Sequence, residues 1–259
     1  MKNAYALAVA AALTAGAAKS APSGNVFASR PELTDQAALY LSASCQRDLM
    51  EKVGRQMLAA GQRSVLGNSA PPSASTIQAT GLAPVASAQL FYTANDSISR
   101  TLHEQIAGRM MRYDPKQAPR IQSLMLSGAI WRDYDALLNR LGYSGRNVAD
   151  VLTSYYIGSW EIVNQSVVTP DRWRAVRNQV ARSLSRSPEI MLMSDIEKQR
   201  SSETLGIVTA VTNANRQSLA IQGDQIGLLA LQSAVYESLM AQGIDLKRLF
   251  ITARGFALR

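Results

Sequence analysis

The 259-residue sequence contains a single cysteine and a single histidine. One cysteine excludes an intramolecular disulfide framework and a zinc site built from several thiolates. One histidine leaves few ways to build a histidine-rich metal site. The sequence also lacks a phosphate-binding glycine loop, a dinucleotide-binding glycine pattern, an HExxH motif and a CxxC motif. We therefore expect neither a metal nor a cofactor.

Charged and aromatic residues are also scarce, at 18% and 6% of the chain. Hydrophobic residues make up 47%, which is enough to bury one sizeable core. Positive charges outnumber negative charges, because the chain has 27 lysines and arginines but 19 acidic residues, which gives a net charge of +8. The composition therefore predicts a folded, basic protein, and a basic surface attracts polyanions.

Beyond the N-terminus, no apolar run reaches the roughly 20 residues that a transmembrane helix needs. Residues 1–3 form a short basic start, and residues 4–18 are small and apolar. Within this run, Ala15-Gly16-Ala17 supplies a small-x-small cleavage pattern. We expect a signal peptide over residues 1–18, and hence a protein that is periplasmic or secreted.

Residues 19–94 have the composition of an N-terminal arm. One helix is plausible from Thr34 to Gly61, and residues 61–94 form a connector rich in Ala, Ser, Pro and Thr. Cys45 falls close to Leu41 and Leu49 on this helix, which favours a buried thiol over a lipid anchor.

Residues 95–259 form the predicted helical domain, because apolar residues recur there at helical spacing. The expected segments are Asp96–Asp114, Ile121–Leu141, Asn147–Asn164, Thr169–Ser187, a helix capped by Ser194, and Asp224–Gly243. The third segment is apolar almost all round, which places it in the middle of a bundle. No alternating strand of useful length is present. The predicted fold is all-α, a multi-helix bundle of about six helices.

Candidates for catalysis are few. The sole histidine, His103, lies near Arg100 and Glu104, a pattern typical of a solvated helix face, and no G-x-S-x-G motif accompanies it. Asp150 and Glu161 are the acidic residues of the apolar helix, and an unpaired buried carboxylate is costly.

Both carboxylates have simpler interpretations. If Asn147 caps the helix, Asp150 lies in the first turn and stabilises the helix dipole by about 0.3–1 kcal/mol. Glu161 lies about 16 Å further along the same helix. This spacing does not match the glycosidase pair, whose carboxylates are about 5–9.5 Å apart, so a second acid would have to come from another helix.

Arginines form the candidate binding surface. Arg172, Arg182 and Arg186 share one helix edge, and Arg140 and Arg146 flank the preceding turn. In an exported protein this surface would meet anionic envelope polymers, lipid head groups or an acidic protein, or would simply remain solvated. Nucleic acid is the less favoured partner, because a DNA-binding protein does not normally carry an export signal.

Short motifs follow one another along the predicted domain. They are Leu141-Gly142-Tyr143, Asn147-Val148-Ala149-Asp150, Tyr155-Tyr156, Trp160, Arg174-Ala175-Val176-Arg177-Asn178-Gln179, Glu197-Lys198-Gln199, Gly243-Ile244-Asp245-Leu246 and Gly255-Phe256. Together they resemble an uncharacterised family of exported bacterial proteins, a domain of unknown function. The resemblance covers residues 95–259 and implies a helical domain behind a signal peptide, but no activity.

These observations favour a non-catalytic binding or assembly module of the bacterial cell envelope, whose partner is an envelope protein or an anionic polymer. One alternative is a helical hydrolase acting on envelope glycan, with Asp150 or Glu161 as one carboxylate. Another is a nucleic-acid-binding protein, which would show a steep salt dependence. The oligomeric state stays open.

Overall fold

The computed structural model describes residues 88–113, 115 and 118–258, and the structural statements below refer to these residues. The predicted signal peptide, most of the predicted arm and Cys45 lie outside them. The helices are α6 Asp96–Tyr113, α7 Ala118–Leu126, α8 Ala129–Arg140, α9 Val148–Asn164, α10 Pro170–Leu184, α11 Pro188–Met191, α12 Asp195–Gln222 and α13 Gln225–Met240. The predicted all-α class is confirmed.

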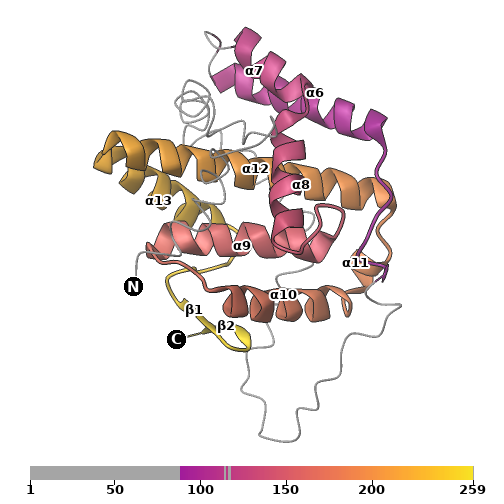
Figure 1. The fold of residues 1–259 in the computed structure, drawn as a ribbon, viewed down its shortest axis with the longest axis vertical. Coiled ribbons are helices and arrows are strands. Elements are labelled where there is room, and N and C mark those ends of the chain that lie inside the picture. Colours follow the sequence, from indigo (N-terminus) through magenta and orange to yellow (C-terminus); the bar gives the residue numbers. More distant parts are fainter. Residues whose placement is uncertain (1–87, 114, 116–117, 259) are drawn as a thin grey trace, which may run out of the picture.

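Helix α9 is the centre of the bundle, as its apolar sequence predicts. Every residue from Val148 to Val163 is buried, and Figure 1 shows α9 between α10 on one side and α12 on the other. Its N-terminus is capped by Asn147, whose side chain accepts hydrogen bonds from the amides of Ala149 (2.9 Å) and Asp150 (3.4 Å). No helix of the described residues is both long enough and apolar enough to cross a membrane.

The predicted helix Ile121–Leu141 is in fact two helices, α7 and α8. They are separated at Gly128, whose φ of 67° is left-handed and suits glycine. Ser127 stabilises the break, because its hydroxyl donates to the Leu124 carbonyl (2.8 Å) and accepts from the Ala129 amide (3.2 Å). Apolar spacing alone does not detect this break, since it continues across the turn.

Residues 249–258 form a short β-hairpin, where the sequence predicts only a turn and a tail. Strands β1 Leu249–Thr252 and β2 Gly255–Leu258 pair antiparallel. The hairpin packs on α10, where the Gln179 side chain accepts from the Phe256 amide (2.7 Å) and donates to its carbonyl (3.0 Å). Each strand has four residues, too few for an alternating pattern to be recognised.

The chain before α6 also belongs to the bundle. Leu90 and Tyr92, in the segment assigned to the arm, are buried in the core. The Leu90 carbonyl accepts from the Val148 amide (3.0 Å), and the Tyr92 hydroxyl donates to the Gly145 carbonyl (3.0 Å). These bonds hold residues 88–94 against the turn that precedes α9.

Helix α12 is the longest described helix, at 28 residues, and it starts with the predicted capping box. The Ser194 hydroxyl accepts from the Glu197 amide (3.3 Å), and the Glu197 carboxylate accepts from the Ser194 amide (2.8 Å). The hydrogen bonds from Ser194 lower the pKa of Glu197. Further along, Gly206 lets α8 approach closely, because a Cβ there would lie 2.5 Å from the Trp131 ring.

Candidate functional site

Helices α6, α8 and α12 enclose a cleft of about 340 Å³, which we call the α6/α8/α12 cleft. This volume lies at the lower end of the range for small-molecule sites, about 300–1,000 Å³. Its charged and titratable wall residues are Asp96, Arg100, His103, Arg132, Asp135, Arg146 and Glu203. Trp131 and Tyr92 supply aromatic surface.

His103 is buried in this cleft, so the prediction that it is solvated is wrong. Its exposed fraction is 5%, and its Nε2 lies 3.4 Å from Oε2 of Glu203 on α12. The sequence prediction relied partly on Glu104, which is exposed, but the next residue along a helix points about 100° away. Arg100, one turn earlier, shares the face of His103 and also lines the cleft.

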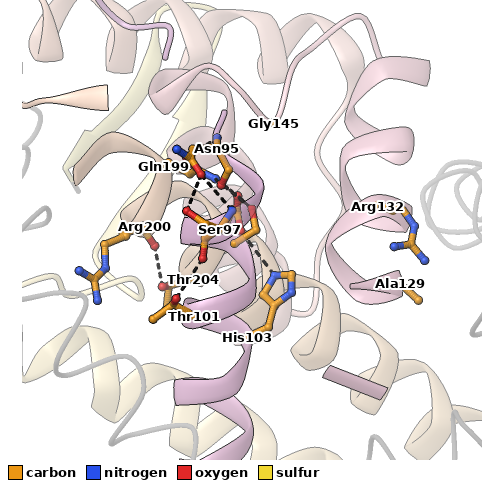
Figure 2. A network of polar contacts seen from close by, with 12 residues as sticks. Asn95, Ser97, Thr101, His103, Ala129, Arg132, Gly145, Gln199, Arg200 and Thr204 are labelled. Atoms are coloured by element: carbon orange, nitrogen blue, oxygen red, sulfur yellow. Dashed lines mark hydrogen bonds and ion pairs between the residues drawn. The ribbon is translucent and has the colours of Figure 1, made fainter. Parts of the chain in front are cut away.

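The Glu203 carboxylate is fixed from its other side. Its Oε1 accepts hydrogen bonds from the Ser99 hydroxyl (2.7 Å) and the Gln199 amide (2.8 Å). Gln199 in turn accepts from the Asn95 amide (2.9 Å) and donates to the Asn95 carbonyl (2.9 Å). Figure 2 shows the resulting network, with Asn95 and Gln199 at one end and His103 at the other. It ties α6 to α12 and leaves Oε2 of Glu203 for the histidine.

This arrangement sets the orientation of the imidazole. Oε2 of Glu203 lies 3.4 Å from Nε2, within ion-pair distance, but neither of these two buried atoms forms a hydrogen bond. The Nδ1 edge faces Gly128: a Cβ there would lie 3.8 Å from Nδ1 and 3.7 Å from Cε1. In the described part of the chain, no group hydrogen-bonds to Nδ1. The histidine therefore presents its unbonded Nδ1 edge at the wall of the cleft.

The N-terminus of α8 opens on the same cleft. Its N-cap, Gly128, has no side chain to cap the helix, and Ser127 satisfies only the amide of Ala129. The first turn therefore keeps the partial positive charge of a helix N-terminus. Arg132 adds a full charge, because its guanidinium donates to the Ser127 carbonyl (2.6 Å) beside Gly128.

Two further arginines lie at the rim of the cleft. Arg100 on α6 and Arg146 in the turn before α9 are exposed, and neither forms an ion pair within the described residues. Two of the three acidic lining residues are engaged, because Asp135 accepts from the Gly145 amide (2.8 Å) and Glu203 is held as described, whereas Asp96 is exposed. Asp96 lies in the first turn of α6, where its charge meets that helix dipole.

Asp150, a sequence candidate for catalysis, does not line the cleft. Its Oδ1 accepts from Nε of Arg177 (2.8 Å), and its Oδ2 accepts from the Ser144 amide (3.0 Å). The residue is 4% exposed and lies in the first turn of α9, as expected from a cap at Asn147. It links α10 and the turn before α9 to the central helix.

Glu161, the second candidate, lies at the far end of α9 and holds the loop that leads to α10. Its Oε1 accepts from the Val168 amide (2.8 Å). Burial raises the pKa of Glu161, although the bond from Val168 and the charge of Arg216 act in the opposite direction. Like Asp150, it does not line the cleft.

The raised pKa makes a prediction about stability. The folded state holds the Glu161 proton more tightly than the unfolded state. The protonated side chain therefore contributes to the free energy of unfolding, and this contribution is fully present below the ordinary pKa of 4.5. It is lost as the pH rises through the folded pKa. Glu161→Gln keeps an acceptor for Val168 but cannot ionise, so its stability relative to the native protein should increase as the pH rises above 4.5. Urea unfolding of both proteins from pH 4 to 8 measures this, and a constant difference would contradict it.

The residues of the predicted arginine surface lie in three places. Arg172, Arg182 and Arg186 are exposed on or just after α10, and Arg140 is exposed at the end of α8. Of the predicted set, Arg146 alone lines the cleft.

The sequence alone does not show that four cleft residues belong to one site: Arg100, His103, Arg132 and Glu203. A weak signal was present. Ser99 with His103, and Gln199 with Glu203, are polar pairs four residues apart, a spacing that puts both members on one helix face. Nothing local indicates that these two faces meet.

Comparisons with known proteins add a family but no activity. No curated protein and no solved structure matches the chain. A family model described as a family of unknown function (DUF6683) matches residues 2–259. This match extends beyond the resemblance over residues 95–259 and includes the predicted arm. The chain therefore belongs to this family of unknown function.

Proposed function

We propose that this protein is an exported module of the bacterial cell envelope that binds an anionic ligand in the α6/α8/α12 cleft. The observation that carries the proposal is a pair of exposed arginines at the rim of the cleft, against one exposed carboxylate, Asp96, among the lining residues. Asp135 and Glu203 are bonded within the protein, whereas Arg100 and Arg146 have no ion-pair partner among the described residues. A carboxylate or phosphate group would complete this site.

The walls of the cleft support the same ligand class. The N-terminus of α8, where Ser127 caps only the Ala129 amide, favours anions through its dipole. His103 provides the independent second feature, because it is buried and its unbonded Nδ1 edge faces the same turn. Trp131 and Tyr92 would contact the apolar part of the ligand.

The location in the envelope rests on the signal-peptide pattern of residues 1–18. The envelope contains polymers and acids that carry carboxylate or phosphate groups, so an exported protein with this cleft has suitable ligands nearby. The structure gives no support to catalysis by Asp150 or Glu161, because both carboxylates bond to backbone amides away from the cleft. Neither carboxylate therefore belongs to the proposed binding site.

A titration with two probes, inorganic phosphate and glutarate, tests the proposal. We expect saturable shifts of the backbone amide signals of Gly128 and its neighbours in ¹⁵N-correlated NMR spectra of the full-length protein. The affinity should fall as the ionic strength rises, because the rim arginines are exposed and the screening length shrinks to about 10 Å at 0.1 M salt. Shifts confined to α10, or shifts that never saturate, would contradict a site in the cleft.

A further inference from the structure

We propose that the α6/α8/α12 cleft also hydrolyses a carboxylic ester of the anionic ligand, with His103 as the general base. This inference rests on the proposed function, because the rim arginines must first hold the ligand. Ester hydrolysis needs a positioned base, a site that stabilises the developing oxyanion, and a group that binds the substrate. The cleft offers residues for each of these tasks.

The base is His103, and its surroundings differ from those of a purely structural histidine. Such a residue would bond through both ring nitrogens, as buried polar groups do. Here Nε2 lies 3.4 Å from Oε2 of Glu203 without forming a hydrogen bond, and Nδ1 has no partner in the described residues and lies at the cleft wall. A positioned general base of this kind contributes about 10²–10⁴ to a rate.

Glu203 is the positioning residue. It is 1% exposed, and Ser99 and Gln199 hold its Oε1 at 2.7 and 2.8 Å. A carboxylate fixed 3.4 Å from Nε2 stabilises the imidazolium that forms when Nδ1 takes a proton. Its bonds come from two helices, so small movements of one side chain do not release it.

The N-terminus of α8 is suited to the oxyanion. The helix is 12 residues long, begins at Gly128 without a side-chain cap, and faces the Nδ1 edge of His103. Arg132 brings a positive charge to the same turn through its bond to the Ser127 carbonyl. Amides and a guanidinium placed in advance of the reaction stabilise negative charge in the transition state.

The reaction needs only water as co-reactant. Nδ1 of His103 takes a proton from a water molecule while the water oxygen forms a bond to the ester carbonyl carbon. The carbonyl π electrons move to oxygen, and the oxyanion lies at the α8 N-terminus. The tetrahedral species then re-forms the carbonyl and breaks the bond to the alcohol oxygen, which leaves with the bonding pair. The imidazolium proton goes to that oxygen or to solvent.

Two chromogenic esters test the inference on the full-length protein, purified without a histidine tag. They are 4-nitrophenyl hemiglutarate, which carries a carboxylate, and 4-nitrophenyl acetate, which does not. We expect saturable release of 4-nitrophenolate from the hemiglutarate, with kcat/KM at least tenfold above that for the acetate. Because the chain has one histidine, His103→Gln should lower kcat by about 100-fold or more.

Two further variants separate catalysis from folding. Imidazole added to His103→Ala should restore part of the turnover. Glu203→Gln should lower kcat by about tenfold or more and leave KM nearly unchanged, because the rim arginines remain. Arg182→Gln, on the exposed edge of α10, is the matched control and should behave as the native protein.

The outcomes distinguish the two proposals. Native protein that binds phosphate in the cleft but shows no saturable turnover would overturn the catalytic inference and leave the proposed function standing. Equal rates for the two esters would also overturn it, and this measurement needs no variant. Failure of phosphate and glutarate to bind would instead overturn the proposed function.

Discussion

Replacing Asp150 with alanine should lower the free energy of unfolding by about 3 kcal/mol, the lower end of the range for breaking a buried ion pair. Asp150 is 4% exposed and accepts from Arg177 (2.8 Å) and from the Ser144 amide (3.0 Å). Without it, a partly buried guanidinium and a backbone amide lose their acceptor. Urea unfolding of the native protein and the variant measures the difference.

A double-mutant cycle with Arg177→Met isolates the ion pair from the other consequences of the substitution. We expect the two substitutions together to cost clearly less than the sum of the single costs, because the methionine leaves no unpaired charge. The Asp150→Ala protein should still bind phosphate under conditions in which it is folded, because Asp150 does not line the cleft. Loss of binding by this folded variant, with little loss of stability, would assign Asp150 to the functional site instead.

The second large effect is expected at Gly206, where α8 and α12 cross. A Cβ on this residue would lie 2.5 Å from Cζ3 of Trp131 and 2.6 Å from Cε1 of Tyr134. Both rings belong to α8 and cannot retreat without moving their helix. Gly206→Ala should therefore lower the free energy of unfolding by about 1–3 kcal/mol, the usual cost of overpacking.

Gly108 provides the matched control, because it is also a helical glycine but has no atom within 4 Å of an added Cβ. Gly108→Ala should raise stability by up to about 1 kcal/mol, since alanine favours the helix. Gly206→Ala should also disturb the cleft, because Trp131 lines it. Equal stability changes at the two glycines would show that α8 and α12 do not pack as described.

The elements that sequence predicts well are those governed by neighbouring residues. Asn147 and Ser194 cap α9 and α12 as expected, and Asp224 caps α13 by accepting from the Gly227 amide (2.8 Å). A cap and the amide it binds lie within three residues, so their pattern is visible in the chain itself. The apolar composition of α9 likewise places it at the centre, because no polar face is available for solvent.

The contacts that make the site are not local. His103 and Glu203 lie 100 residues apart in sequence, and only the crossing of α6 and α12 brings them together. The same holds for Asp150 with Arg177, and for Gln179 with Phe256. Several of these residues belong to the motifs of the family resemblance, so the motifs are contact partners rather than separate features.

We propose above all that the α6/α8/α12 cleft, and not the α10 edge, binds an anion. The most direct measurement compares phosphate titrations of Arg100→Gln/Arg146→Gln and Arg172→Gln/Arg182→Gln. Both double variants lose two positive charges, so a nonspecific effect of net charge would weaken both equally. We expect at least tenfold weaker binding for the cleft variant and near-native binding for the α10 variant. Equal binding by the two variants, or a loss confined to the α10 variant, would contradict it.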